Sequence, residues 1–179
     1  MIDMCLLGSG GGMPMPWRNL SSTLISYKGR KILIDCGEGT QVSMKMVGWG
    51  FKTIDIICIT HVHGDHIIGL PGLLSTIGNS GKTSKLTIIG PRGITKVVNG
   101  LRVIVEYLPY NLEIIEDPSM VNFKLKKDGL ESDNTEGNII LHTLNLDHSS
   151  PCIGYKFIFK RNRKFDLKKA MENDIPKVL

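Results

Sequence analysis

Apolar residues follow two kinds of spacing along this 179-residue chain, and each predicts a different element. Where apolar and polar residues alternate, or where several apolar residues run together, a strand is expected. Such segments cover 1–7, 20–27, 31–35, 54–59, 85–89, 112–116, 121–126, 138–146 and 151–160. The second and third are expected to form a hairpin that turns at Gly29. The chain therefore begins with three neighbouring strands.

Apolar residues at helical spacing predict four helices among and after these strands. They cover 40–47, 65–77, 93–107 and 166–172, and the second is interrupted at Pro71 and Gly72. Asp166 is suited to cap the last helix, and Pro176 prevents it from continuing. The polar stretch 128–137 is expected to be a loop. Strands that alternate with helices are typical of an α/β domain.

Composition narrows the class of protein. With 41% hydrophobic and 22% charged residues, the chain is an ordinary globular domain and not a disordered or fibrous protein. The first residues do not resemble a secretory signal, because Asp3 is acidic and the apolar run stops at Gly8. No stretch approaches the roughly 20 apolar residues of a membrane span. The four cysteines are scattered and lie beside apolar residues, as free thiols do. We therefore expect a cytoplasmic protein without a membrane partner.

The chemistry is concentrated in segment 60–66, which reads Thr-His-Val-His-Gly-Asp-His directly after a predicted buried strand. His61 and His63 are two residues apart, so in an extended loop they point the same way. Asp65 and His66 are adjacent and must diverge in the turn that the preceding glycine permits. Two neighbouring ions fit these four side chains better than one, with two ligands each. Zn²⁺ suits imidazole and carboxylate ligands, and Mn²⁺ is the alternative.

This spacing resembles the motif of the metallo-β-lactamase superfamily, and other segments make the chain similar to ribonuclease Z in particular. They are Gly69-Leu-Pro-Gly-Leu-Leu74, Gly37-Glu-Gly-Thr-Gln41 after Asp35, the glycine loop followed by Arg18 and Ser21-Ser22, Ile89 to Gly93, Leu146 to Tyr155, Phe165 to Ala170 and Asp174 to Pro176. The resemblance covers nearly the whole chain. It implies one metallo-β-lactamase-like α/β domain over residues 1–179, an αβ/βα sandwich of which only the first half and the start of the second are expected here.

The resemblance also assigns site residues. It places His148 beside His61 and His63 as a metal ligand, and it makes Asp65 the catalytic residue that orients the attacking water. His142 matches no ligand of the family and is interpreted as structural. A bridging aspartate and a last histidine are expected beyond the end of this sequence, so the second ion would have only Asp65 and His66 here.

Carboxylates near the motif are assigned supporting roles. Asp35 is expected to hold the ligand loop by hydrogen bonds, and Glu38 is interpreted as part of the same buttress and not as a catalytic group. Asp147 is interpreted as a turn residue, because its neighbour His148 already fills the ligand position.

The function implied by the resemblance is that of a zinc-dependent endonuclease which removes the 3′ trailer from precursor tRNA and leaves a 3′-hydroxyl. The intact protein is expected to be a homodimer with two Zn²⁺ ions in each site. The net charge is +5, and residues 160–179 alone carry seven Lys or Arg against three acids, 7 − 3 = +4. This basic end is either a phosphate-binding surface or a solvated segment. Its candidates for RNA contacts are Lys160, Arg161, Arg163 and Lys164.

Two other functions are compatible with the motif. The chain could be another hydrolase of the metallo-β-lactamase fold that acts on a small ester, lactam or phosphodiester, although the segments 69–74 and 37–41 argue against this. It could also be a non-catalytic fragment, because two metal ligands and the tRNA-binding arm of the family are not found in these residues.

Overall fold

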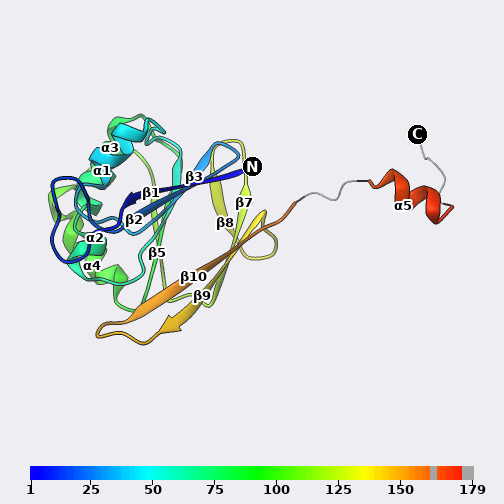
Figure 1. Cartoon of the computed structure of the whole chain (residues 1–179). Helices are drawn as coiled ribbons and strands as arrows, with labels where there is room; N and C mark the ends of the chain where they lie inside the picture. Colours follow the sequence, from blue (N-terminus) through cyan, green and yellow to red (C-terminus); the bar gives the residue numbers. More distant parts are fainter. Residues whose placement is uncertain (162–164, 175–179) are drawn as a thin grey trace.

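Two β-sheets packed face to face form the body of the protein, and helices cover one outer side (Figure 1). This computed structural model describes residues 1–161 and 165–174. The first sheet has the order β1-β2-β3-β4-β5-β6. Its strands are β1 (Ile2–Gly8), β2 (Ser22–Tyr27), β3 (Arg30–Ile34), β4 (Ile54–Cys58), β5 (Leu86–Gly90) and β6 (Leu112–Glu116). Strands β1 to β3 are antiparallel and β3 to β6 are parallel, so the parallel strands all end at one edge.

The second sheet is antiparallel throughout and has the order β10-β9-β7-β8. Its strands are β7 (Met120–Leu125), β8 (Leu130–Asp133), β9 (Ile139–Leu146) and β10 (Cys152–Phe159). Phe123 and Leu141 point inward and pack with Ile32 and Ile56 of the first sheet. The apolar positions that alternate along these strands therefore form the layer between the sheets.

The helices cover the other face of the first sheet. They are α1 (Thr40–Val47), α2 (Gly64–Ile67), α3 (Leu70–Asn79) and α4 (Ile94–Leu101), which the 3₁₀ turn η1 (Arg102–Ile104) follows. Leu73 and Leu74 of α3 pack against Leu33 and Ile57. Because Ile57 faces the helices and its neighbour Ile56 faces the second sheet, β4 is apolar on both sides. This explains the apolar run from Ile56 to Ile59 that helps to predict the strand.

The predicted break in the helix 65–77 is in the wrong place. The structure has two helices, which separate at Ile68 and Gly69, and Pro71 lies in the first turn of α3. Proline is tolerated there, because the first amides of a helix have no partner within it. A Cβ on Gly69 would lie 2.3 Å from the carbonyl oxygen of Gly37, so the close approach of these two backbone segments requires glycine here.

Two further predictions are wrong in part. The helix predicted over 93–107 ends at Leu101 and tightens into η1. The segment 128–137, predicted as a loop, contains β8, where Leu130 is buried and its amide donates to Asp55 Oδ2 at 2.9 Å. One apolar residue among polar ones does not signal a strand, because pairing with β7 and the bond to Asp55 define it.

The last helix is α5 (Leu167–Glu172), and Asp166 caps it as predicted by accepting the Lys169 amide. Figure 1 shows it apart from the two sheets. Pro176 lies outside the described residues. On the outer face of the second sheet, Leu144 and Leu146 are exposed by 59% and 52%, and no helix in the described part of the chain covers them. Within residues 1–161 and 165–174, no helix is long and apolar enough to cross a bilayer.

Candidate metal centre

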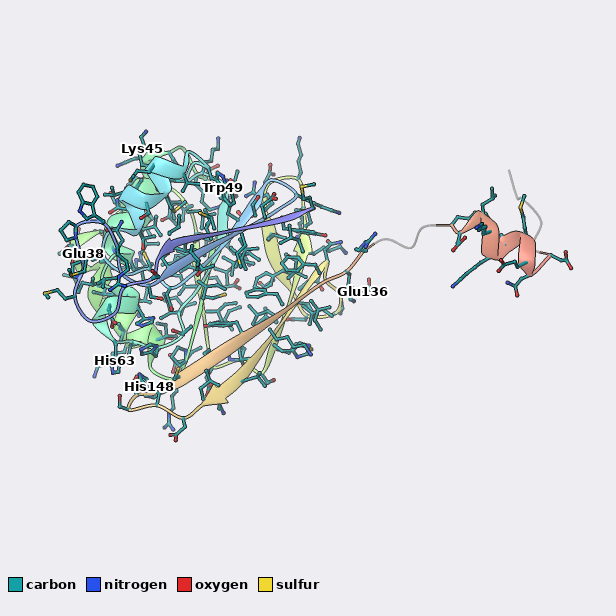
Figure 2. All side chains as sticks on the ribbon, viewed as in Figure 1. Glu38, Lys45, Trp49, His63, Glu136 and His148 are labelled. Atoms are coloured by element: carbon teal, nitrogen blue, oxygen red, sulfur yellow. The ribbon has the colours of Figure 1, made fainter. Side chains whose placement is uncertain are left out.

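Three histidines from two distant parts of the chain lie together at one end of the sandwich. His61 and His63 follow β4, and His148 lies in the turn between β9 and β10. One ring nitrogen from each lies within 4.8 Å of the others, and Nε2 of His148 is 3.2 Å from Nδ1 of His63. Figure 2 shows His63 and His148 next to each other on this end. The structure thus brings together the three side chains predicted for the first ion.

The end of β4 explains why the histidines gather there. The chain leaves the sheet after Cys58, at the edge where the parallel strands end. His63 still has an extended backbone, with φ −67° and ψ 147°, immediately before α2 begins. His61 and His63 therefore project from one extended stretch toward the same region, and their ring centroids are 4.8 Å apart.

Asp35 lies directly behind this loop. Its carboxylate accepts hydrogen bonds from the amide of Thr60 at 2.8 Å, from the hydroxyl of Thr60 at 2.9 Å and from Nδ1 of His66 at 2.7 Å. Because a carboxylate only accepts, Nδ1 of His66 carries a proton and Nε2 of the neutral ring keeps its lone pair. Asp35 has φ 58°, a left-handed conformation that aspartate tolerates better than most residues. The prediction that Asp35 supports the ligand loop by hydrogen bonds is confirmed.

Asp65 and His66 lie beside the three histidines, and the ring centroids of His66 and His61 are 4.0 Å apart. Oδ2 of Asp65 is 3.7 Å from Nε2 of His66. The same oxygen accepts a hydrogen bond from the backbone amide of Gly12 at 2.8 Å. That amide is the main reason why the pKa of Asp65 lies below its usual value. The hydrogen bond to Asp35 raises the pKa of His66. The pKa of His61 is lowered, mainly by burial and to a smaller extent by the positive charge that His66 carries when protonated. Asp65 is therefore a carboxylate at neutral pH, and His61 is a neutral imidazole there, as a metal ligand must be.

Other candidate residues do not belong to the histidine group. His142 lies on β9, in register with Met120 and Lys156, and does not belong to the histidine group. Asp147 and Glu38 are exposed, and neither side chain makes a hydrogen bond in the described part of the chain. The buttress role that Glu38 was expected to share therefore rests on Asp35.

The basic residues predicted to contact RNA lie after β10. Lys160 and Arg161 are exposed where that strand has ended, so they are open to solvent. Arg163 and Lys164 lie outside the described residues.

Sequence reasoning missed three groups that shape the site. The Gly12 amide approaches Asp65 from the glycine loop, Thr60 links the histidine loop to Asp35, and the Tyr155 hydroxyl donates to main-chain carbonyls beside that loop. Gly12 has φ 72°, which explains a glycine at this position, but nothing in the sequence indicates that its amide meets a carboxylate 53 residues away.

Comparison with known proteins gives one family and a consistent set of relatives. The family model described as "Anti-Pycsar protein Apyc1" matches residues 2–167. The Ribonuclease Z of Clostridium beijerinckii is 62% identical over 179 residues, which are 100% of this chain and 56% of that protein. The Ribonuclease Z of Clostridioides difficile is 60% identical over the same share of each chain. The chain spans about 56 to 58% of the length of the curated relatives it matches.

Solved structures agree on the fold. The short form of human tRNase Z aligns with a TM-score of 0.71 and 28% identity over 89% of this chain and 65% of that one. The metallo-β-lactamase fold protein YhfI from Bacillus subtilis aligns with a TM-score of 0.65 and 18% identity over 88% and 58%. The predicted α/β metallo-β-lactamase fold is therefore confirmed.

Proposed function

This chain belongs to the family described as Anti-Pycsar protein Apyc1 and matches the N-terminal part of ribonuclease Z, and from that premise we propose that it carries the histidine ligands of a tRNA 3′-processing endonuclease. The proposed reaction is zinc-dependent hydrolysis of the phosphodiester bond that joins the 3′ trailer to precursor tRNA, which leaves a 3′-hydroxyl on the tRNA. The grouping of His61, His63 and His148 carries this proposal.

The three histidines fit a zinc ion. With Zn–N bonds of about 2.1 Å, nitrogens at two corners of a tetrahedron are roughly 3.4 Å apart. The 3.2 Å between Nε2 of His148 and Nδ1 of His63 is close to this separation, and the ligand nitrogens of all three histidines lie within 4.8 Å of one another. We propose Asp65 and His66 as ligands of a second ion. Mn²⁺ is the weaker candidate for the first ion, because it prefers oxygen ligands and this group offers imidazoles.

The roles of the protein side chains follow from their contacts. When bound, zinc activates water at neutral pH and neutralises charge on the phosphate oxygens. The Gly12 amide keeps Asp65 ionised and fixes one of its oxygens, so Asp65 can orient a water and accept its proton. Asp35 holds His66 in one tautomer and, through Thr60, fixes the residue before His61.

The partner proposed for this site is precursor tRNA. Lys160 and Arg161 are exposed, and we propose that with Arg163 and Lys164 they contact phosphates of the RNA. Neutralising all four is expected to weaken tRNA binding and reduce its salt dependence, as measured by filter binding at about 50 to 200 mM salt. An unchanged salt slope would refute this assignment. We propose further that the protein acts in the cytoplasm as a homodimer.

The first experiment measures zinc per chain in the purified protein, alongside His63→Ala and His142→Ala. His142 lies outside the histidine group, so it controls for the loss of any histidine. We expect bound zinc to be lost with His63→Ala and retained with His142→Ala. Equal zinc in all three proteins would contradict the proposed centre.

The second experiment separates the possible substrates. Precursor tRNA and a small phosphodiester, bis(p-nitrophenyl) phosphate, are offered to the zinc-loaded protein. Cleavage of the tRNA after the acceptor stem supports the proposal, whereas turnover of the small ester alone favours another hydrolase of this fold. Zinc binding without turnover of either substrate would mean that these 179 residues hold metal but do not catalyse by themselves.

A further inference from the structure

Strand β10 brings one polar group into the apolar layer beside the histidine loop. The hydroxyl of Tyr155 is 2.6 Å from the carbonyl oxygen of Ile59 and 3.1 Å from that of Ile89. Its single proton is thus shared between the ends of two strands of the first sheet. Burial raises the pKa of Tyr155, so the phenol stays protonated and remains a donor. The roles proposed above for the histidines and carboxylates do not explain why the Tyr155 hydroxyl is buried at this place.

The contacts of Tyr155 join the two parts of the metal centre. Ile59 is followed by Thr60 and His61, whereas Tyr155 is on the strand that begins just after His148. The amide of Ile153 donates to the carbonyl of Thr60 at 2.9 Å, which adds a main-chain link at the same place. The first sheet supplies His61 and His63, so these bonds fix the position of the His148 turn relative to both.

The ring of Tyr155 is itself held in place. It stacks with Phe157 at 6.4 Å between centroids, Phe157 stacks with Phe159 at 6.2 Å, and Phe159 meets Tyr27 of the first sheet at 4.9 Å. This row of rings runs along the inner face of β10 and leaves the hydroxyl in one position. The hydroxyl is therefore suited to set a distance between the sheets.

We propose that Tyr155 is a positioning residue for the metal centre: its hydroxyl, bound to the carbonyls of Ile59 and Ile89, holds the turn with His148 at bonding distance from the metal shared with His61 and His63. This inference rests on the proposed metal site. It predicts that removal of the Tyr155 hydroxyl changes the geometry and affinity of metal binding more than it changes the stability of the fold.

Tyr110 offers a matched control. Its hydroxyl is also buried and donates to a main-chain carbonyl, that of Leu74, at 2.8 Å. It lies in the helical layer and makes no contact with the histidine loop among the described hydrogen bonds. Tyr155→Phe and Tyr110→Phe therefore remove the same chemical group from the two sides of the first sheet.

The test measures Co²⁺ and Zn²⁺ dissociation constants by competition with a chromogenic chelator, the visible spectrum of bound Co²⁺, and the melting temperature of the metal-free proteins. We expect Tyr155→Phe to weaken metal binding about tenfold and to change the cobalt spectrum. Tyr110→Phe should leave the metal affinity and the cobalt spectrum unchanged. It should lower the melting temperature by about as much as Tyr155→Phe does. Wild-type affinity and spectrum in Tyr155→Phe would overturn the positioning role alone.

Two further outcomes are decisive. If the wild-type protein binds no Co²⁺, or if His63→Ala binds it equally well, the proposal of a metal centre is refuted. The positioning role of Tyr155 is then refuted as well. If Tyr155→Phe does not fold, 4-fluorophenylalanine at position 155 replaces it, because its fluorine fills the space of the hydroxyl but cannot donate a hydrogen bond. An unchanged cobalt spectrum in that protein would overturn the proposal.

Discussion

Replacing Asp35 with asparagine should weaken both the fold and the metal site. The side-chain amide introduced by Asp35→Asn can keep its oxygen on the Thr60 amide, but its NH₂ group then faces Nδ1 of His66, where the wild-type distance to Oδ2 is 2.7 Å. One charge-assisted hydrogen bond is lost, which corresponds to about 2 kcal/mol of unfolding free energy. If His66 responds by moving its proton to Nε2, it loses the lone pair with which it would bind metal.

The expected result is therefore a double loss. Zinc affinity should fall between about 10-fold and 100-fold, the usual effect of removing a hydrogen-bond partner of a metal ligand. Urea denaturation of the metal-free protein should show the loss of unfolding free energy, and chelator competition should show the loss of affinity.

Glu113→Gln is the matched control, because it also converts a partly buried, hydrogen-bonded carboxylate into an amide. Glu113 interacts with Lys85, Thr87 and Ser132 between β5, β6 and β8, in a network that includes none of the histidines. The Glu113→Gln protein should be less stable than the wild type and should bind zinc with unchanged affinity. If Asp35→Asn binds zinc as tightly as Glu113→Gln does, Asp35 does not support the metal ligands.

Three other predictions test the fold. Gly69→Ala should destabilise the protein by more than about 2 kcal/mol, because the new Cβ would lie 2.3 Å from the Gly37 oxygen. Gly100→Ala on α4 has open space around its Cβ and should stabilise the protein by up to about 1 kcal/mol. Equal urea midpoints for the two variants would contradict this prediction. Phe123→Ala should cost about 3–5 kcal/mol, because the ring is fully buried between the sheets, and a loss below about 1 kcal/mol in urea denaturation would show that the sheets do not pack as described. Burial acts to raise the pKa of Glu113, but hydrogen bonds led by that of Lys85 outweigh it and the pKa lies below 4.5. Since its pKa is depressed in the folded state, Glu113 contributes stability above about pH 4.5 that is lost as the pH falls below this value, and Glu113→Gln should reduce this acid-dependent loss in denaturation curves at about pH 7, 5 and 4.

Much of the framework follows from local signals in the sequence. The strand over 54–59 is recognisable because it is apolar on both faces, and the helix 40–47 has the predicted bounds. Asp166 caps α5, as its position before the helix suggests. These features depend on neighbouring residues, which a sequence displays directly.

The remaining features depend on contacts between distant residues. Leu130 lies in a strand because β7 pairs with it and Asp55 accepts its amide, 75 residues away in sequence. The hydroxyl of Tyr155 meets the carbonyl of Ile59 across 96 residues, and nothing around Tyr155 distinguishes it from an ordinary strand tyrosine. The histidine group is predictable only in part: the segment 60–66 is recognisable by itself, whereas His148 is assigned through family resemblance.

The separation of His63 and His148 by 85 residues also has a kinetic consequence. Closing a chain segment of that length carries a logarithmic entropy term of about 4 kcal/mol, which contacts between the docked sheets must offset before the two rings can meet. The proposed metal site would therefore be absent from any folding intermediate that contains only one sheet. In a refolding experiment, the cobalt absorption should rise only in the phase in which the second sheet docks, so metal uptake would report the docking of the two sheets.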